Sequence, residues 1–201
     1  MIDIYIKFSF IVLCFIIALC SFWFCRSKKD WAYLAVAMAF TMLSDFFLVL
    51  IGNDRIGVFV FCFVHMTYIL RVSDDHNKSM SQIAAIICGG GLAFAAFVFI
   101  PALPLIDPLI VFGIVYGSLF VLNLIHHIKY FLRGGANRKI MIIGLILFAL
   151  CDIHVLMFNL HRFVLIPPEI TFWGRAWIWV YYTPSQILLG VSAVRWDKNT
   201  L

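Results

Sequence analysis

Residues 8–24 read FSFIVLCFIIALCSFWF, a run without a single charged side chain. A helix needs about 20 mostly apolar residues to cross the hydrocarbon layer of a membrane, and this run comes close to that length. A membrane-spanning β-strand would instead alternate apolar and polar side chains over about ten positions. The run does not alternate, and no small-x-small cleavage site precedes Arg26. The sequence therefore predicts a retained transmembrane helix.

The rest of the chain has the same character. Apolar residues make up 64% of the 201 residues, charged residues only 12%, and the mean hydropathy is +1.04. A soluble domain has roughly half apolar and a quarter charged residues. We expect seven spans, at residues 4–24, 31–51, 56–71, 82–100, 106–128, 139–160 and 174–194. Residues 1–201 then form a single integral membrane domain, an all-α polytopic helical bundle, in which the short segment 56–71 lies among other helices.

Basic residues are distributed unevenly between the loops on the two sides of such a bundle. The loops on one side hold Arg26, Lys28, Lys29, Arg71, Lys78, Lys129, Arg133, Arg138, Lys139, Arg195 and Lys198. The other side holds Lys7, Arg55, Arg162 and Arg175. This asymmetry predicts a cell-membrane protein with its N-terminus outside and its C-terminus in the cytoplasm. Basic loops next to anionic lipid headgroups also explain the net charge of +5, so no nucleic-acid partner is expected.

Two aspartates, Asp45 and Asp152, lie well inside apolar runs. A carboxylate in the hydrocarbon layer is unfavourable, so such residues usually face the interior of a bundle and mark a functional site. They lie about 14 and 13 residues from the predicted starts of their helices, which places them at similar depth at about 1.5 Å per residue. Each is followed ten residues later by an arginine, Arg55 or Arg162. We expect the two carboxyl groups to meet across the bundle.

Other polar side chains occur inside the predicted spans. His65 and Tyr68 are three residues apart in the third span, and Tyr182 and Gln186 share a helical face in the last one because they are four apart. Lys7 lies near the outer end of the first span. Each has a structural explanation as well: a histidine in a helix is often a hydrogen-bonded core residue, and a lysine near a helix end can extend to the interface.

Two further groupings are possible from residue type. Tyr116 and Asn123 are seven apart in the fifth span and could line one cavity. Asp45, His65 and Asp152 are of the types that bind transition metals. No HxxxH or HExxH spacing accompanies them, and we expect neither a metal nor a cofactor.

Five stretches, in this order, resemble the YhhN family of lysoplasmalogenases over nearly the whole chain. They are Lys7 after the apolar start, Ser44-Asp45-Phe-Phe-Leu, Phe61-Cys-Phe-Val-His65-Met-Thr-Tyr68, Gly144 to Asp152, and Tyr182-Thr-Pro-Ser-Gln186. Three positions depart from the family pattern: Phe8 replaces a usual proline, Cys151 a usual serine and Thr183 a frequent tyrosine. Family members commonly have eight spans, one more than expected here.

The resemblance implies an ether hydrolase that cleaves the vinyl ether bond of a lysoplasmalogen. The products would be a fatty aldehyde and glycerophosphoethanolamine or glycerophosphocholine. Vinyl ethers resist base and open when carbon is protonated, which requires a carboxylic acid that keeps its proton near neutral pH. Apolar surroundings and a neighbouring carboxylate both favour the neutral form of a carboxyl group. Our hypothesis is that either Asp45 or Asp152 is the general acid, while the other stabilises the developing cation and orients water.

The remaining residues receive supporting roles in this hypothesis. His65 would hold one aspartate or assist proton transfer, and Tyr68, Tyr182 and Gln186 would position water and the glycerol hydroxyl. Lys7, Arg55 or Arg162 would bind the phosphate of the lysophospholipid. The surrounding partners are membrane lipids, and the sequence predicts no particular oligomeric state.

Two other functions suit the same composition. A cation- or proton-coupled transporter also needs buried acids, and Gly89-Gly-Gly91 and Pro101-x-x-Pro104 could mark breaks in its helices. A metal-dependent membrane hydrolase acting on a lipid ester or amide is the second alternative.

Overall fold

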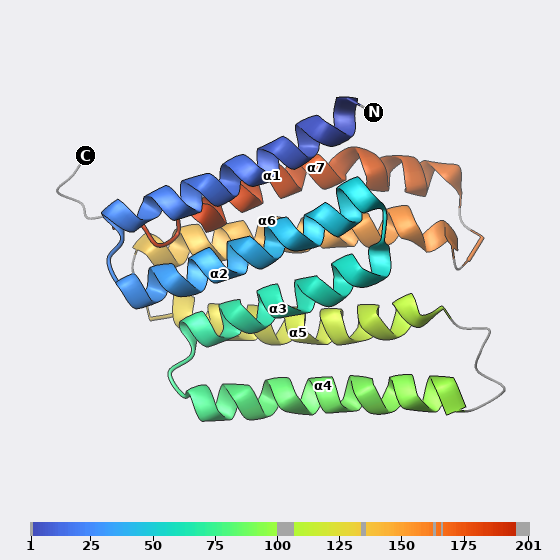
Figure 1. The fold of residues 1–201 in the computed structure, drawn as a ribbon, viewed down its shortest axis with the longest axis horizontal. Helices are drawn as coiled ribbons and strands as arrows, with labels where there is room; N and C mark the ends of the chain where they lie inside the picture. The colour runs from blue at the N-terminus through green and yellow to red at the C-terminus, as the bar shows by residue number, and fades with distance from the viewer. Residues whose placement is uncertain (1, 100–106, 134–135, 163, 166, 196–201) are drawn as a thin grey trace.

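The computed structural model describes residues 2–99, 107–133, 136–162, 164–165 and 167–195; the Pro101-x-x-Pro104 segment lies outside them. The described chain forms an all-α bundle, as predicted. Its seven α-helices are α1 (Ile2–Cys20), α2 (Lys28–Asp45), α3 (Asp54–Val72), α4 (His76–Phe99), α5 (Pro108–Phe131), α6 (Ala136–Asn159) and α7 (Pro168–Gly190) (Figure 1). Three short helical segments extend α1, α2 and α6: η1 (Ser21–Phe24), η2 (Phe46–Ile51) and η3 (Leu160–Arg162).

Five of these helices are long and apolar enough to cross a membrane: α1, α2, α3, α5 and α6 with their extensions. The chain is therefore a multi-pass membrane protein. Helix α7 is less apolar than these five, because it contains Glu169, Arg175 and several polar side chains. The prediction that the third span lies among other helices is confirmed. Of the most apolar 18-residue stretch of α3, 56% is buried inside the protein, against 17–33% in the other four spans.

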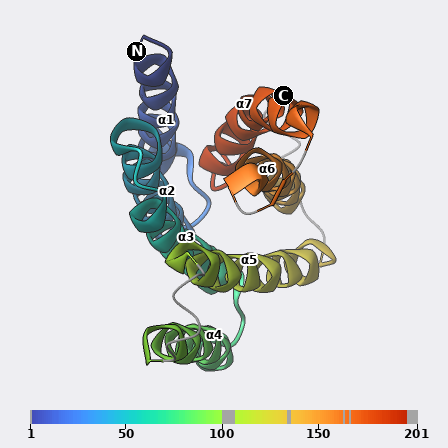
Figure 2. The ribbon, with the colours of Figure 1, turned by 90° about the vertical axis from the view of Figure 1, so that its right-hand side faces the viewer.

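The helices run back and forth along one axis (Figure 1). Viewed along that axis, α1, α2, α3 and α5 form a curved row, and α6 and α7 pack as a pair on its inner side (Figure 2). Helix α4 lies outside the row, against α5 and α3. We call the end where α2, α4 and α6 begin the basic end of the bundle, and the other the opposite end.

Local sequence signals explain where several helices begin. The side chains of Ser27, Asn53 and Asp107 accept hydrogen bonds from backbone N–H groups in the first turns of α2, α3 and α5. Pro168 at the start of α7 needs no hydrogen-bond acceptor for its nitrogen. The predicted range 174–194 starts six residues too late, because hydropathy alone overlooks the first turns that this proline begins, and it ends four residues too late.

The backbone changes its winding next to Asp45. Helix α2 ends at Asp45 and continues as the π-helical segment η2, which Gly52 terminates in a left-handed conformation (φ 70°). π-helical turns are frequent at functional sites. The hydroxyl of Ser44 donates to the Gly57 carbonyl at 2.6 Å, which fixes α2 and α3 at the same level. A Cβ atom at Gly57 would meet the Leu48 side chain, which would have to shift to make room.

The two ends of the described chain are joined at the basic end. The Arg26 N–H donates to the Ala193 carbonyl at 3.2 Å, and the Arg195 N–H donates to the Phe24 carbonyl at 2.9 Å. These bonds connect the segment after α1 to the segment after α7, so the first and last helices close one side of the bundle.

Candidate functional site

Asp45 is the last residue of α2 and is buried, with 4% of its surface exposed. The hydroxyl of Tyr182, which is also buried on α7, donates a hydrogen bond to the Oδ2 atom of Asp45. A hydrogen bond to a carboxylate is among the stronger kinds in proteins. This contact therefore fixes the carboxyl group of α2 against α7.

Asp152 has an equivalent partner on another helix. It lies on α6, and the hydroxyl of Tyr116 on α5 donates to its Oδ2 atom at 2.6 Å. Asp45 and Asp152 lie 17 and 16 residues after the starts of their helices, or about 26 and 24 Å along them. The structure thus brings the two predicted aspartates to one level, in the half of the bundle toward the opposite end.

Aromatic rings separate the two tyrosine–aspartate pairs. Phe148 on α6 lies one turn before Asp152, and its ring centroid is 6.0 Å from that of Tyr182 and 5.8 Å from that of Phe61. The Phe61 ring is in turn 6.1 Å from the ring of Tyr116. The carboxyl groups are therefore surrounded by apolar and aromatic surface contributed by four helices.

His65 joins this cluster through its neighbours. It is fully buried on α3, its Nδ1 atom lies 3.1 Å from the amide nitrogen of Asn123, and its ring is 4.9 Å from that of Tyr116. Its described contacts include neither carboxylate, so His65 reaches Asp152 by way of the Tyr116 ring. Tyr116 and Asn123 thus both contact His65, and the cavity that they could line stays a prediction. In the sequence, these two residues are recognisable as polar side chains seven positions apart in one apolar span.

Several buried polar atoms near these residues have no hydrogen-bond partner among the described residues. Both side-chain polar atoms of Gln186 are of this kind, as are Nε2 of His65, Oδ1 of Asn123 and Nε2 of His127. Gln186 lies on α7 one turn from Tyr182 and is 1% exposed. An unpaired buried polar group costs about 1–3 kcal/mol. Such groups suit a site that receives a polar molecule.

Tyr68 lies away from the carboxyl groups. Its hydroxyl donates to the sulfur of Met38 at 3.7 Å, and its ring is 6.1 Å from that of His127. Along α3 it is 11 residues from Gly57, which is level with Ser44, and this corresponds to about 16 Å. Its position shares a face with His65, but the rise of the helix carries it toward the basic end.

Lys7 connects to the site through aromatic rings. Its ammonium group lies 5.4 Å from the centroid of Trp179, whose ring is 5.5 Å from that of Tyr182. Lys7 also forms an ion pair with Asp3 at 2.6 Å, one turn earlier on α1. A basic group therefore lies close to the Asp45–Tyr182 pair, on the side of the opposite end.

The other two predicted phosphate ligands each have a carboxylate partner in the structure. Arg55 pairs with Asp107 at 3.3 Å, and Arg162 pairs with Asp54. Both pairs lie at the opposite end and connect α3 to the chain preceding α5 and to η3. These arginines thus have a structural role there.

The positions of the acidic, histidine and cysteine side chains also bear on a possible metal site. Among the described residues, no three His, Cys, Asp or Glu side chains are grouped as ligands of one ion. Asp45 and Asp152 bond to tyrosines, and His65 faces Asn123 and aromatic rings.

Comparison with known proteins gives one finding. No curated protein and no solved structure is significantly similar to this chain. The sequence profile of the YhhN family matches residues 2–193, which include both aspartates and both tyrosines that bind them. Since the match covers nearly the whole chain, this protein belongs to the YhhN family.

Proposed function

We propose that the protein is a lysoplasmalogenase that hydrolyses the vinyl ether bond of a lysophospholipid by acid catalysis. The observation that carries this proposal is the pair of intramembrane carboxyl groups at one level of the bundle, each held by a tyrosine from another helix. One carboxyl group holds a proton in apolar surroundings while the second provides a negative charge nearby. Membership of the YhhN family is consistent with a membrane protein of this kind.

The chemistry proceeds in three balanced steps. The protonated carboxyl group transfers its proton to the outer vinyl carbon, and the vinyl oxygen donates its electrons to form an oxocarbenium ion. Water adds to the cationic carbon and releases a proton to the second carboxylate, which gives a hemiacetal. The second carboxyl group then protonates the glycerol oxygen while the first carboxylate takes the proton of the hemiacetal hydroxyl, and the carbon–oxygen bond to glycerol breaks, which yields the aldehyde and the glycerophospho-base and restores both carboxyl groups.

The tyrosines and aromatic rings suit these steps. Each tyrosine hydroxyl binds the Oδ2 atom of its aspartate, so Oδ1 is available to hold or accept a proton. The ring faces of Tyr116, Phe148 and Tyr182 provide quadrupoles that attract a positively charged intermediate. The oxocarbenium ion would therefore be stabilised by a carboxylate and by aromatic faces together.

The surrounding polar residues suit the rest of the substrate. Gln186 and the His65–Asn123 pair provide the unpaired buried atoms that would position the water and the glycerol hydroxyl. Lys7 would bind the phosphate by exchanging its exposed partner Asp3 for the lipid. This arrangement places the headgroup toward the opposite end of the bundle.

The test is aldehyde release by the purified protein in detergent. Wild type should form fatty aldehyde from lysoplasmalogen, and Asp45→Asn and Asp152→Asn should reduce the rate to background because an amide cannot donate the proton. Asp74→Asn is the matched control, since Asp74 is exposed at the basic end and remote from the pair. All variants should elute as monodisperse protein, and substantial turnover by either site variant would refute the proposal.

The same assay separates the two alternative functions. A cation- or proton-coupled transporter would release no aldehyde in detergent, where there is no gradient. A metal-dependent hydrolase acting on an ester or amide would release a fatty acid or amine and would lose activity with a chelator. Acid catalysis by the carboxyl pair requires aldehyde release that a chelator does not reduce.

A further inference from the structure

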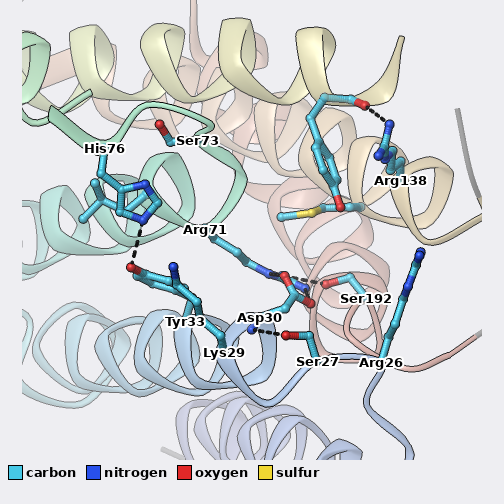
Figure 3. Close-up of a pocket in the computed structure, with 13 residues that line it drawn as sticks. Arg26, Ser27, Lys29, Asp30, Tyr33, Arg71, Ser73, His76, Arg138 and Ser192 are labelled. Atoms are coloured by element: carbon cyan, nitrogen blue, oxygen red, sulfur yellow. Dashed lines mark hydrogen bonds and ion pairs between the residues drawn. The ribbon is translucent and has the colours of Figure 1, made fainter. Parts of the chain in front are cut away.

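A second polar feature lies at the basic end, in a cavity of about 430 Å³ (Figure 3). Its walls come from the starts of α2, α4 and α6, the ends of α3 and α5, and the segment after α7. Four of its lining residues are Lys or Arg: Arg26, Lys29, Arg71 and Arg138. The only carboxylate that lines it is Asp30.

One half-buried ion pair neutralises that carboxylate. The side chain of Arg71 is 1% exposed, and its Nε and Nη2 atoms donate to the two oxygens of Asp30 at 2.8 and 2.9 Å. Its Nη1 atom donates to the hydroxyl of Ser192 at 2.8 Å. Each of the three guanidinium nitrogens of Arg71 therefore donates a hydrogen bond, which fixes this side chain as the floor of the cavity.

The other three cations are not neutralised. Within the described part of the chain, Arg26 and Lys29 have no acidic partner. Arg138 donates to the Tyr130 carbonyl at 3.1 Å and lies over the Tyr130 ring at 4.3 Å, which are contacts without a negative charge. The cavity thus has an excess of three positive charges.

Helix orientation increases this preference for anions. Lys29 and Asp30 lie in the first turn of α2, and His76 begins α4. The N-terminus of a helix carries a partial positive charge and unpaired N–H groups, which favour anionic ligands. The hydroxyl of Tyr33, 3.2 Å from His76 Nε2, and that of Ser73 add hydrogen-bonding groups to the wall.

We propose that this cavity binds a phosphate group, as a soluble phosphate ester or as the headgroup of an anionic lipid. It is a different place from the carboxyl pair, because Arg71 lies 14 residues beyond Gly57 along α3, or about 21 Å. In a lysoplasmalogen only the three glycerol carbons separate the vinyl ether oxygen from the phosphate oxygen. One substrate molecule therefore cannot occupy both places, and this inference is independent of the proposed reaction.

The experiment uses the purified protein in nanodiscs of phosphatidylcholine. In the first arm, inorganic phosphate or glycerol 3-phosphate is titrated at constant ionic strength with chloride as the balancing anion, and the thermal unfolding midpoint is recorded. In the second arm, part of the phosphatidylcholine is replaced by phosphatidic acid. The site variant is Lys29→Gln with Arg138→Gln. The control is Lys28→Gln with Lys139→Gln, which removes two exposed charges one residue away, outside the cavity.

The site variant should bind phosphate at least about tenfold more weakly than wild type, since it loses charge-assisted hydrogen bonds. The control should stay within about twofold of wild type, as expected for exposed charges. Stabilisation in the first arm would identify the ligand as a soluble phosphate ester. Stabilisation confined to the second arm would identify it as a lipid headgroup. Equal losses in both double variants, or no stabilisation of wild type by any of these probes, would overturn the proposal.

Discussion

Gly174 allows the close crossing of α6 and α7, the two helices with the most extensive contact in the described chain. A Cβ atom at this position would lie 2.7 Å from the backbone nitrogen of Phe158 and 3.0 Å from the carbonyl oxygen of His154. These are backbone atoms of α6, so no side-chain rotation relieves the contact. Restoring an ordinary distance of 3.4 Å requires the helices to separate by about 0.7 Å.

The substitution Gly174→Ala should therefore destabilise the protein by about 1–2 kcal/mol. Overpacking typically costs about 1–3 kcal/mol, and the better helix propensity of alanine offsets up to about 1 kcal/mol of it. The assay is SDS- or heat-induced unfolding in detergent, followed by the fluorescence of Trp173, Trp177 and Trp179 on α7 itself. This change also moves Tyr182 relative to Asp152, so aldehyde release should fall with stability.

Gly91→Ala is the matched control, because Gly91 is also helical but its Cβ would meet nothing within 4 Å. The control should be as stable as wild type or slightly more so. If Gly174→Ala were equally stable, the close packing of α6 against α7 described above would be incorrect.

Three further predictions concern the site and the ion pairs. Tyr182→Phe and Tyr116→Phe should each lower aldehyde release by about tenfold or more, since a hydrogen bond to a charged group contributes about 1.5–3 kcal/mol; unchanged turnover in both would remove the tyrosines from the mechanism. Arg71→Gln should destabilise by about 1.5–3 kcal/mol, as expected when hydrogen bonds between charged groups are lost but the remaining carboxylate, Asp30, is still 33% exposed, whereas an unfolding curve like that of wild type would show the pair to be dispensable. The Arg133 guanidinium lowers the pKa of exposed Asp74. This pair's small contribution to stability should be present at neutral pH, disappear as the pH falls through that lowered pKa, and be absent at every pH from Asp74→Asn; equal pH profiles of the two proteins would contradict this.

The fold could be predicted largely from hydropathy. Long apolar runs separated by basic loops allow few arrangements other than a helical bundle, and the predicted range 56–71 differs from α3 (Asp54–Val72) by two residues at one end and one at the other. The start of α7 at Pro168 was not predictable in this way, because its first turns are polar. The change from α- to π-helix after Asp45 also has no counterpart in a hydropathy pattern, because it depends on how η2 packs between α1 and α3.

The candidate site could be predicted in part. A charged residue within an apolar run can be recognised from the sequence alone, and this is how Asp45 and Asp152 were predicted. The pairing of these aspartates with Tyr116 and Tyr182 could not be recognised in this way, since the partners are 36 and 137 residues apart in the sequence. Tyr68 shows the opposite error: helical spacing correctly placed it on the face of His65, but the axial rise separates it from the carboxyl groups.

Hydrolysis in D₂O tests the central claim most directly, because proton transfer from a carboxyl group to carbon leaves a label in the product. Purified protein should convert lysoplasmalogen into fatty aldehyde carrying one deuterium on the carbon next to the carbonyl, as measured by mass spectrometry immediately after a single turnover. Asp45→Asn and Asp152→Asn should form this labelled aldehyde only at the background rate. Aldehyde without deuterium, or labelled aldehyde formed at the wild-type rate by either variant, would contradict acid catalysis by the aspartate pair.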